Sequence, residues 1–307
     1  MLRPAPKFHD HVTLAILARA ISALFAAMMG AFVKAAGNSG AGWGEIIFFR
    51  QAVALPVILA WVLLGPGLRA LRTNRPRAHL VRAIVGLTSL AFMFYALSLL
   101  PLSEAMTIFF ISPLVATCLS AMLLGEKVGI QRWLAIGVGF SGVIVLMNPG
   151  GGASDISTLG IAIAVTASIL MALVTITLRQ LGTTENEAAI VFRFAMAGTV
   201  VTGFLYPFFY QPHQLFTWLM MLGVGVCGAV VQVTTTMSLR LAPVSLTAPF
   251  DYTQLFWAAL IGWLIWADLP AWSTAAGGLL IAGSGLYTFY RERLHRQSIA
   301  KQATPTN

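Results

Sequence analysis

Charged residues are scarce in this chain. They make up 9% of its 307 residues, whereas 58% of the residues are hydrophobic and the mean hydropathy is +0.83. A soluble protein of this length needs a polar surface, and average composition puts charged residues near ~25%. The shortage of charge therefore excludes an ordinary soluble protein and indicates a surface that faces lipid.

Cysteine is also rare, which argues against a disulfide-rich protein and against a cysteine metal site. The two cysteines, Cys118 and Cys227, lie inside apolar runs and show no metal-binding spacing such as CxxC. A disulfide scaffold and a cysteine metal site are therefore not expected. The sequence predicts no metal, no cofactor and no catalytic residue.

Acidic residues are few relative to basic ones. The chain has 10 Asp and Glu against 19 Lys and Arg, which gives a net charge of +9. A strongly basic chain can bind nucleic acid. Here the basic residues lie mostly in short gaps between apolar runs, which favours a role in membrane topology, and no nucleic-acid partner is expected.

Long apolar runs are what the sequence has in abundance. A membrane helix needs about 20 mostly apolar residues to cross roughly 30 Å of hydrocarbon. Ten runs meet this requirement, and each is predicted to be a helix because the bilayer core cannot satisfy open backbone groups. They cover residues 13–36, 45–65, 79–99, 104–124, 131–148, 157–179, 187–209, 215–238, 244–266 and 271–291.

The basic residues between these runs predict the orientation of the chain. Loops rich in Lys and Arg stay in the cytoplasm. Arginines crowd residues 68–82 and the tail after residue 291, whereas the alternate gaps carry Asp155, Asp268 or nothing basic. We therefore expect a multi-pass protein of the bacterial-type inner (plasma) membrane, with both termini and the tail 292–307 in the cytoplasm.

The two halves of the chain resemble each other. Five positions recur in order at a constant offset: Leu97, Pro101, Ser103, Ala116 and Glu126 correspond to Leu239, Pro243, Ser245, Ala258 and Asp268. Each half, 13–148 and 157–291, holds five predicted helices. Because five is odd, the second half would enter the membrane upside down. Inverted repeats of this kind form transporters whose substrate site lies between the repeats.

Several motifs fall in a distinctive order within residues 13–291. They are FFR at 48–50, YAL at 95–97, Pro113, LGEK at 124–127 and TAPFDY at 247–252. In these motifs the chain resembles the drug/metabolite transporter superfamily, specifically its ten-helix proteins with two EamA domains. The resemblance implies secondary transport of a small metabolite, such as an amino acid, a nucleoside-like or a vitamin-like compound. Some members of the superfamily import riboflavin or S-adenosylmethionine.

Six charged residues in or at the predicted helices stand out: four basic residues that the loops do not explain, and two acids. Charges at such depth are costly and usually face a cavity or a partner. Counting about 1.5 Å per residue assigns them to two layers, an inner layer of Arg19, Arg193 and Asp251 and an outer layer of Lys34, Arg50 and Glu104. The alternative for the long side chains is that they snorkel to the membrane interface.

Asp251 is too short to snorkel, so we expect it to pair with Arg193 or Arg19. Further candidates for a substrate-binding or gating cavity are Tyr95, Gln232, Tyr252 and Gln254. For the aromatic residues the alternative is packing or lipid contact. A cavity with net positive charge would favour substrates that carry a carboxylate or a phosphate.

These features predict a carrier that works by alternating access, in which the inner and outer layers open in turn. The alternatives are a membrane-embedded enzyme, although HExxH and GxSxG motifs are absent, and a passive channel. Pro113 and Pro249 predict kinks in the fourth and ninth helices. Glycine-rich runs, including the GxGxxG patterns at 137–142 and 223–228, are expected to serve helix packing, with a homodimer possible through the fifth and tenth helices.

Overall fold

The chain folds into a bundle of helices. The computed structural model describes all residues except 1–7, 125–129, 148–156, 183, 242–246 and 303–307. Every regular element in the described part is helical, and seven of its helices are long and apolar enough to cross a membrane. This confirms the predicted all-α membrane fold, and it agrees with the need of a spanning segment to satisfy its own backbone.

The helices follow the predicted segments closely. In the first half they are α1 (Phe8–Asn38), α2 (Trp43–Leu64), the 3-10 turn η1 (Leu68–Leu71), α3 (Pro76–Leu99), α4 (Leu102–Phe109), α5 (Ser112–Leu124) and α6 (Ile130–Met147). In the second half they are α7 (Thr158–Gly182), α8 (Glu187–Phe209), α9 (Leu215–Leu241), the 3-10 turn η2 (Ala248–Tyr252), α11 (Thr253–Trp266) and α12 (Trp272–Gln302). The last helix continues into the predicted tail.

The fourth predicted helix, 104–124, is interrupted near Pro113, although Leu102–Leu119 still counts as one apolar span. The structure divides it into α4 and α5, with the break directly before Pro113. Proline lacks an N–H and disfavours helical geometry in the residue before it. The backbone N–H of Ile111 accordingly donates to the carbonyl oxygen of Ile108 at 3.0 Å, a tighter turn than an α-helix makes. In the second half Pro249 lies in η2, so the irregularities predicted at both prolines are confirmed.

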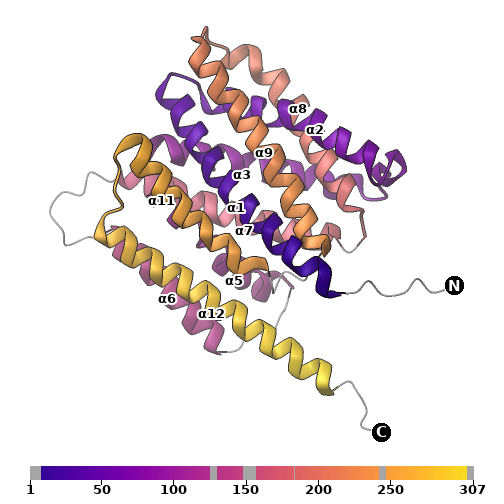
Figure 1. Cartoon of the computed structure of the whole chain (residues 1–307), viewed down its shortest axis with the longest axis vertical. Helices are drawn as coiled ribbons and strands as arrows, with labels where there is room; N and C mark the ends of the chain where they lie inside the picture. Colours follow the sequence, from indigo (N-terminus) through magenta and orange to yellow (C-terminus); the bar gives the residue numbers. More distant parts are fainter. Residues whose placement is uncertain (1–7, 125–129, 148–156, 183, 242–246, 303–307) are drawn as a thin grey trace.

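The helices pack in pairs that cross between the two halves. α1 packs along α9, α3 along α7, α2 against α8, and α6 against α12. Figure 1 shows α6 with α12 at one edge of the bundle and α2 with α8 at the opposite edge. If each helix were exchanged for its counterpart in the other half, the α1–α9 pair would become the α3–α7 pair. The α2–α8 and α6–α12 pairs would stay the same. An inverted repeat predicts such pairing, although the division into two repeats stays a prediction.

The glycine-rich runs serve helix packing, as predicted. A Cβ atom added to Gly142 of α6 would lie 2.8 Å from the carbonyl oxygen of Gly277 on α12, so these backbones approach closely because neither has a side chain. On α9, Gly223 lies against the ring of Phe32 in the same way. The GxGxxG runs are therefore helix contacts. The homodimer stays a prediction.

Candidate functional site

Asp251 binds Arg19, which decides between its two predicted partners. Asp251 lies in η2, and Arg19 lies on α1. Arg19 Nη2 donates to Asp251 Oδ2 at 2.5 Å, and Arg19 Nε donates to Oδ1. Beside this pair the hydroxyl oxygens of Ser22 and Thr235 are 2.6 Å apart, which also ties α1 to α9. The predicted ion pair is therefore confirmed for Arg19.

Arg193 has a different partner. Its Nη2 atom donates to the backbone carbonyl oxygen of Leu71 at 3.0 Å. This contact anchors η1 to α8, so the alternative pairing of Arg193 with Asp251 is wrong. The inner layer therefore consists of one ion pair and one arginine that holds a loop.

The three residues of the predicted outer layer do not meet. Lys34 Nζ donates to Asp268 Oδ2 at 2.9 Å and lies 4.9 Å from the centre of the Trp266 ring. Glu104 is buried, and it accepts hydrogen bonds from Ser103 at 2.8 Å and Thr274 at 3.1 Å. Arg50 contacts neither of them and lines a separate pocket. Equal depth in the membrane therefore did not mean contact.

A glutamate–histidine pair links the loop regions at one end of the bundle. Glu45, in the first turn of α2, is fully buried. Its Oε2 atom lies 2.9 Å from His213 Nε2, and its Oε1 atom accepts the backbone N–H of Gln211 at 3.1 Å. The start of α2 is thus joined to the segment between α8 and α9.

A second glutamate–histidine pair lies at the opposite end. Glu185 Oε2 is 3.4 Å from His79 Nε2, and Glu185 Oε1 accepts the backbone N–H of Asn74 at 3.1 Å. Burial alone would raise the pKa of the Glu185 carboxyl, but hydrogen bonds from Thr73, Asn74 and His79 together hold that pKa below its usual range. This pair joins the segment between α7 and α8 to the start of α3.

Two ion pairs, Arg19–Asp251 and Lys34–Asp268, and two glutamate–histidine contacts in the described part of the chain join residues 13–148 to residues 157–291. Arg19–Asp251 and His79–Glu185 lie toward the end of the bundle at which α1 begins. Lys34–Asp268 and Glu45–His213 lie toward the other end, where α1 ends and α2 begins. Each end of the bundle is therefore tied across the two halves by one ion pair and one glutamate–histidine contact.

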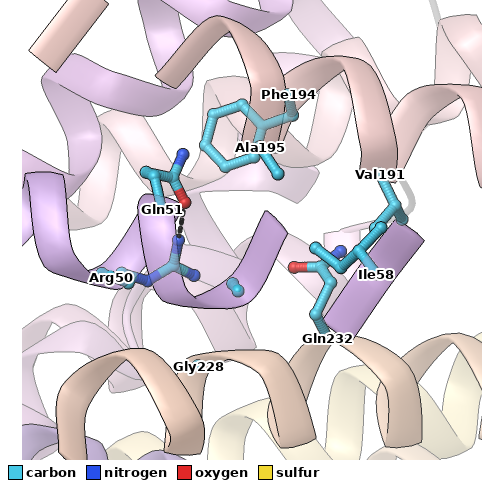
Figure 2. Close-up of a pocket in the computed structure, with 9 residues that line it drawn as sticks. Arg50, Gln51, Ile58, Val191, Phe194, Ala195, Gly228 and Gln232 are labelled. Atoms are coloured by element: carbon cyan, nitrogen blue, oxygen red, sulfur yellow. Dashed lines mark hydrogen bonds between the residues drawn. The ribbon is translucent and has the colours of Figure 1, made fainter. Parts of the chain in front are cut away.

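A narrow pocket lies between α2, α8 and α9. Its polar lining comes from Arg50, Gln51 and Gln232, and Ile58 and Phe194 form part of its apolar wall. Arg50 Nη1 donates to Gln51 Oε1 at 2.7 Å. Figure 2 shows this bond and shows the Gln232 side chain rising from α9 toward α2. Both halves of the chain contribute to the pocket.

Sequence reasoning missed two residues beside this pocket. Arg82 was counted among the loop arginines of 68–82, but it is 7% exposed on α3, with its guanidinium carbon 4.1 Å from the centre of the Phe194 ring. Its place within the third helix, beyond the helix start at Pro76, was the available signal. Gln51, which is 1% exposed, follows Arg50 directly.

The other predicted polar and aromatic candidates lie elsewhere. Tyr95 is 39% exposed, the Tyr252 ring packs 4.9 Å from the Phe110 ring, and Gln254 Nε2 lies 3.2 Å from Met106 Sδ. Of the predicted residues only Arg50 and Gln232 line the pocket together. The functional roles of all these residues stay predictions.

Comparison with known proteins points to one family. Residues 13–148 match the EamA-like transporter family. The chain is 27% identical over 267 residues to the pseudopaline exporter CntI of Pseudomonas aeruginosa, which covers 87% of this chain and 92% of that protein. It is 26% identical over 249 residues to the S-adenosylmethionine uptake transporter of Rickettsia bellii, covering 81% of this chain and 84% of the relative.

Two further similarities extend this result. The chain is 26% identical over 238 residues to the riboflavin transporter of Vibrio cholerae, covering 77% of this chain and 79% of that protein. A solved crystal structure that is 20% identical matches with a TM-score of 0.65 over 92% of this chain and 99% of its own. At that identity the structural match supports the fold alone.

Proposed function

Because this chain belongs to the drug/metabolite transporter superfamily, we propose that it is a secondary carrier that moves a small organic metabolite across the inner membrane by alternating access. The coarser statement, that it is a small-molecule transporter and not an enzyme, follows from the family and from the relatives named as transporters. The alternative of a membrane-embedded enzyme is thereby overturned.

The observation that carries the proposal is the placement of the two ion pairs and two glutamate–histidine contacts described above. Each joins one half of the chain to the other, and two lie toward each end of the bundle. A carrier must close one end while the other opens. The contacts at one end can break while those at the other end stay intact. The pocket lined by Arg50 lies between the two ends.

The ends would then act as two gates. Breaking Lys34–Asp268 and Glu45–His213 would free the predicted outer end, and breaking Arg19–Asp251 and His79–Glu185 would free the predicted cytoplasmic end. The substrate is proposed to be an amino acid, a nucleoside-like or a vitamin-like compound. The relatives transport pseudopaline, S-adenosylmethionine and riboflavin.

Thiol accessibility tests the two gates directly. Both native cysteines are replaced by alanine, and Gln232→Cys reports on the pocket through an impermeant maleimide applied to intact cells. We expect Lys34→Gln with Glu45→Gln to raise labelling from outside, because the outer contacts are lost. We expect Arg19→Gln with Glu185→Gln to lower it, because the free energy then favours the inward-open state.

A passive channel is the remaining alternative and gives a different result. In a channel both pairs of substitutions would raise labelling, since each widens one continuous path. Purified protein in liposomes supplies the second readout. Saturable uptake with counterflow of a preloaded metabolite supports the carrier, whereas fast flux without saturation would refute it. Arg69→Gln, which removes an exposed charge outside both gates, is the matched control.

A further inference from the structure

Several buried hydrogen-bond donors beside the pocket have no acceptor among the described residues. In the described part of the chain, seven buried side-chain nitrogen or oxygen atoms have no hydrogen-bond partner, and four of them gather here: Arg50 Nε, Gln51 Nε2, Arg82 Nε and Arg82 Nη1. The oxygen of the Gln51 amide is already taken by Arg50. Buried donors left unpaired destabilise a fold, so this cluster favours a ligand rich in acceptors.

The positive charge of the cluster also has no counterpart. Arg50 and Arg82 repel one another electrostatically, and neither forms an ion pair with any described Asp or Glu. The described acids of the helices are engaged elsewhere, Glu104 with Thr274 and Asp251 with Arg19. The face of the Phe194 ring offsets part of the Arg82 charge. Neither guanidinium group therefore has a carboxylate partner among the described residues.

The helices are shaped to hold these side chains in place. Gly228 of α9 lies against Arg50, Gly198 of α8 lies against the Gln51 amide, and Gly86 of α3 lies against the Arg82 guanidinium. A Cβ atom at Gly228 would lie 3.3 Å from Arg50 Cγ, and at the other two positions it would collide with the polar group. Each of these polar side chains has room because the neighbouring residue is glycine. The packing of the helices therefore accommodates all three side chains.

We propose that Arg50 and Arg82, helped by the Gln51 amide, bind the carboxylate or phosphate group of a soluble organic anion that the protein carries. Arginine suits this task because its planar fork of N–H groups matches the oxygens of a carboxylate or phosphate. The proposal rests on the carrier function given above. It adds the chemical class of the substrate and two residues, Arg82 and Gln51, that recognise it.

The depth of the site favours a soluble solute over a lipid headgroup. Arg50 is seven residues beyond Trp43, the first residue of α2, and so lies about 10 Å along the helix from one end. Arg82 is six residues beyond Pro76 at the start of α3, about 9 Å from the opposite end. Both residues therefore lie more than one helical turn inside the helices that carry them. A lipid phosphate stays at the membrane interface.

Thermal stability of the purified protein in neutral phosphatidylcholine nanodiscs tests the proposal. The probes are inorganic phosphate, and matched pairs of one acid with its uncharged analogue: riboflavin 5′-phosphate with riboflavin, and N-acetyl amino acids with their amides. We expect phosphate and at least one organic acid to raise the Tm of the wild type, since a ligand that binds the native state stabilises it. The uncharged analogues should raise it less.

Arg50→Gln and Arg82→Gln provide the decisive comparison. Each should weaken the apparent affinity for the acid by at least about tenfold, because one charge-assisted set of hydrogen bonds is lost. Each should also raise the Tm without ligand, because an unpaired buried cation is removed. A merely structural arginine would show the opposite change in Tm. Arg50→Lys, which keeps the charge, should retain part of the response, and Arg69→Gln should keep all of it.

Three results of the binding experiment would overturn the anion site. One is stabilisation by acids that persists in Arg50→Gln and Arg82→Gln. Another is the absence of any response to phosphate or to the acids in the wild type. The third is stabilisation by anionic phosphatidylglycerol in place of the soluble acids, which would assign the site to a lipid. If the acids bind through Arg50 and Arg82 but proteoliposomes show no counterflow, the site stands and the carrier function fails. Counterflow of neutral metabolites alone would refute the site and leave the carrier.

Discussion

At the scale of single residues, the pairing of Asp251 with Arg19 gives the sharpest prediction. Asp251→Ala leaves the Arg19 guanidinium without its acceptor, and breaking a buried pair in this way costs at most about 3–5 kcal/mol. The loss should be smaller than that, because the Asp251 side chain is still 32% exposed. Arg19→Leu added to Asp251→Ala should restore part of the lost stability. A double-mutant cycle on Tm measures this coupling.

Two controls accompany this cycle. Arg193→Leu should not rescue Asp251→Ala, because Arg193 donates to the Leu71 carbonyl oxygen. Asp268→Ala breaks the more exposed pair with Lys34, whose carboxylate is 37% exposed, and should cost no more than about 1 kcal/mol. A coupling of zero between Asp251 and Arg19 would mean that the carboxylate acts on the substrate or on a proton instead.

The partner of Asp251 also marks a limit of sequence reasoning. Counting residues from the helix ends placed Arg19 and Arg193 at the same depth as Asp251, so depth alone could not choose between them. Depth says nothing about lateral position in a bundle, which the packing of α1 against η2 decides. Arg82 was missed for the same reason, because its burial depends on Phe194 and Gly86 from other helices or turns.

At the scale of elements, the contact of Glu185 with the start of α3 predicts a dependence on pH. The folded-state pKa of Glu185 is lowered. Its contribution to stability is therefore complete above the unfolded pKa of a glutamate and is lost as the pH falls through the lowered folded value. We expect the difference in Tm between wild type and Glu185→Gln to be largest near neutral pH and to disappear in acid.

The control for this element lies two residues away. Glu187→Gln removes an exposed acid from the first turn of α8 and leaves the His79 contact intact. Its difference in Tm from the wild type should change little over the same pH range. A pH profile that is equal for Glu185→Gln and Glu187→Gln would show that the contact of Glu185 with α3 does not contribute to stability.

At the scale of the whole molecule, the arginine-rich segment 68–82 predicts the orientation. α1 begins and α12 ends at the same end of the bundle (Figure 1), so we expect both termini on one side of the membrane. In the cysteine-free background, Asn74→Cys should resist an impermeant thiol reagent on intact cells and react after permeabilisation. Gln211→Cys, exposed at the other end, should react at once. Labelling of Asn74→Cys in intact cells would reverse the proposed orientation.

Much of the whole fold could be predicted because it depends on local signals. Apolar runs long enough to span the bilayer located the helices, and Pro113 and Pro249 located their irregularities. The site was harder, because it depends on which helices are neighbours. The pocket joins α2, α8 and α9, and no spacing along the chain places Gln232 opposite Arg50.

The contacts between the halves have a consequence for the order in which the protein is made. The ribosome delivers the N-terminal half first, so Arg19, Lys34, Glu45 and His79 enter the membrane before Asp251, Asp268, His213 and Glu185 exist. The contacts that tie the two halves together at both ends can therefore form only after the C-terminal half has been made.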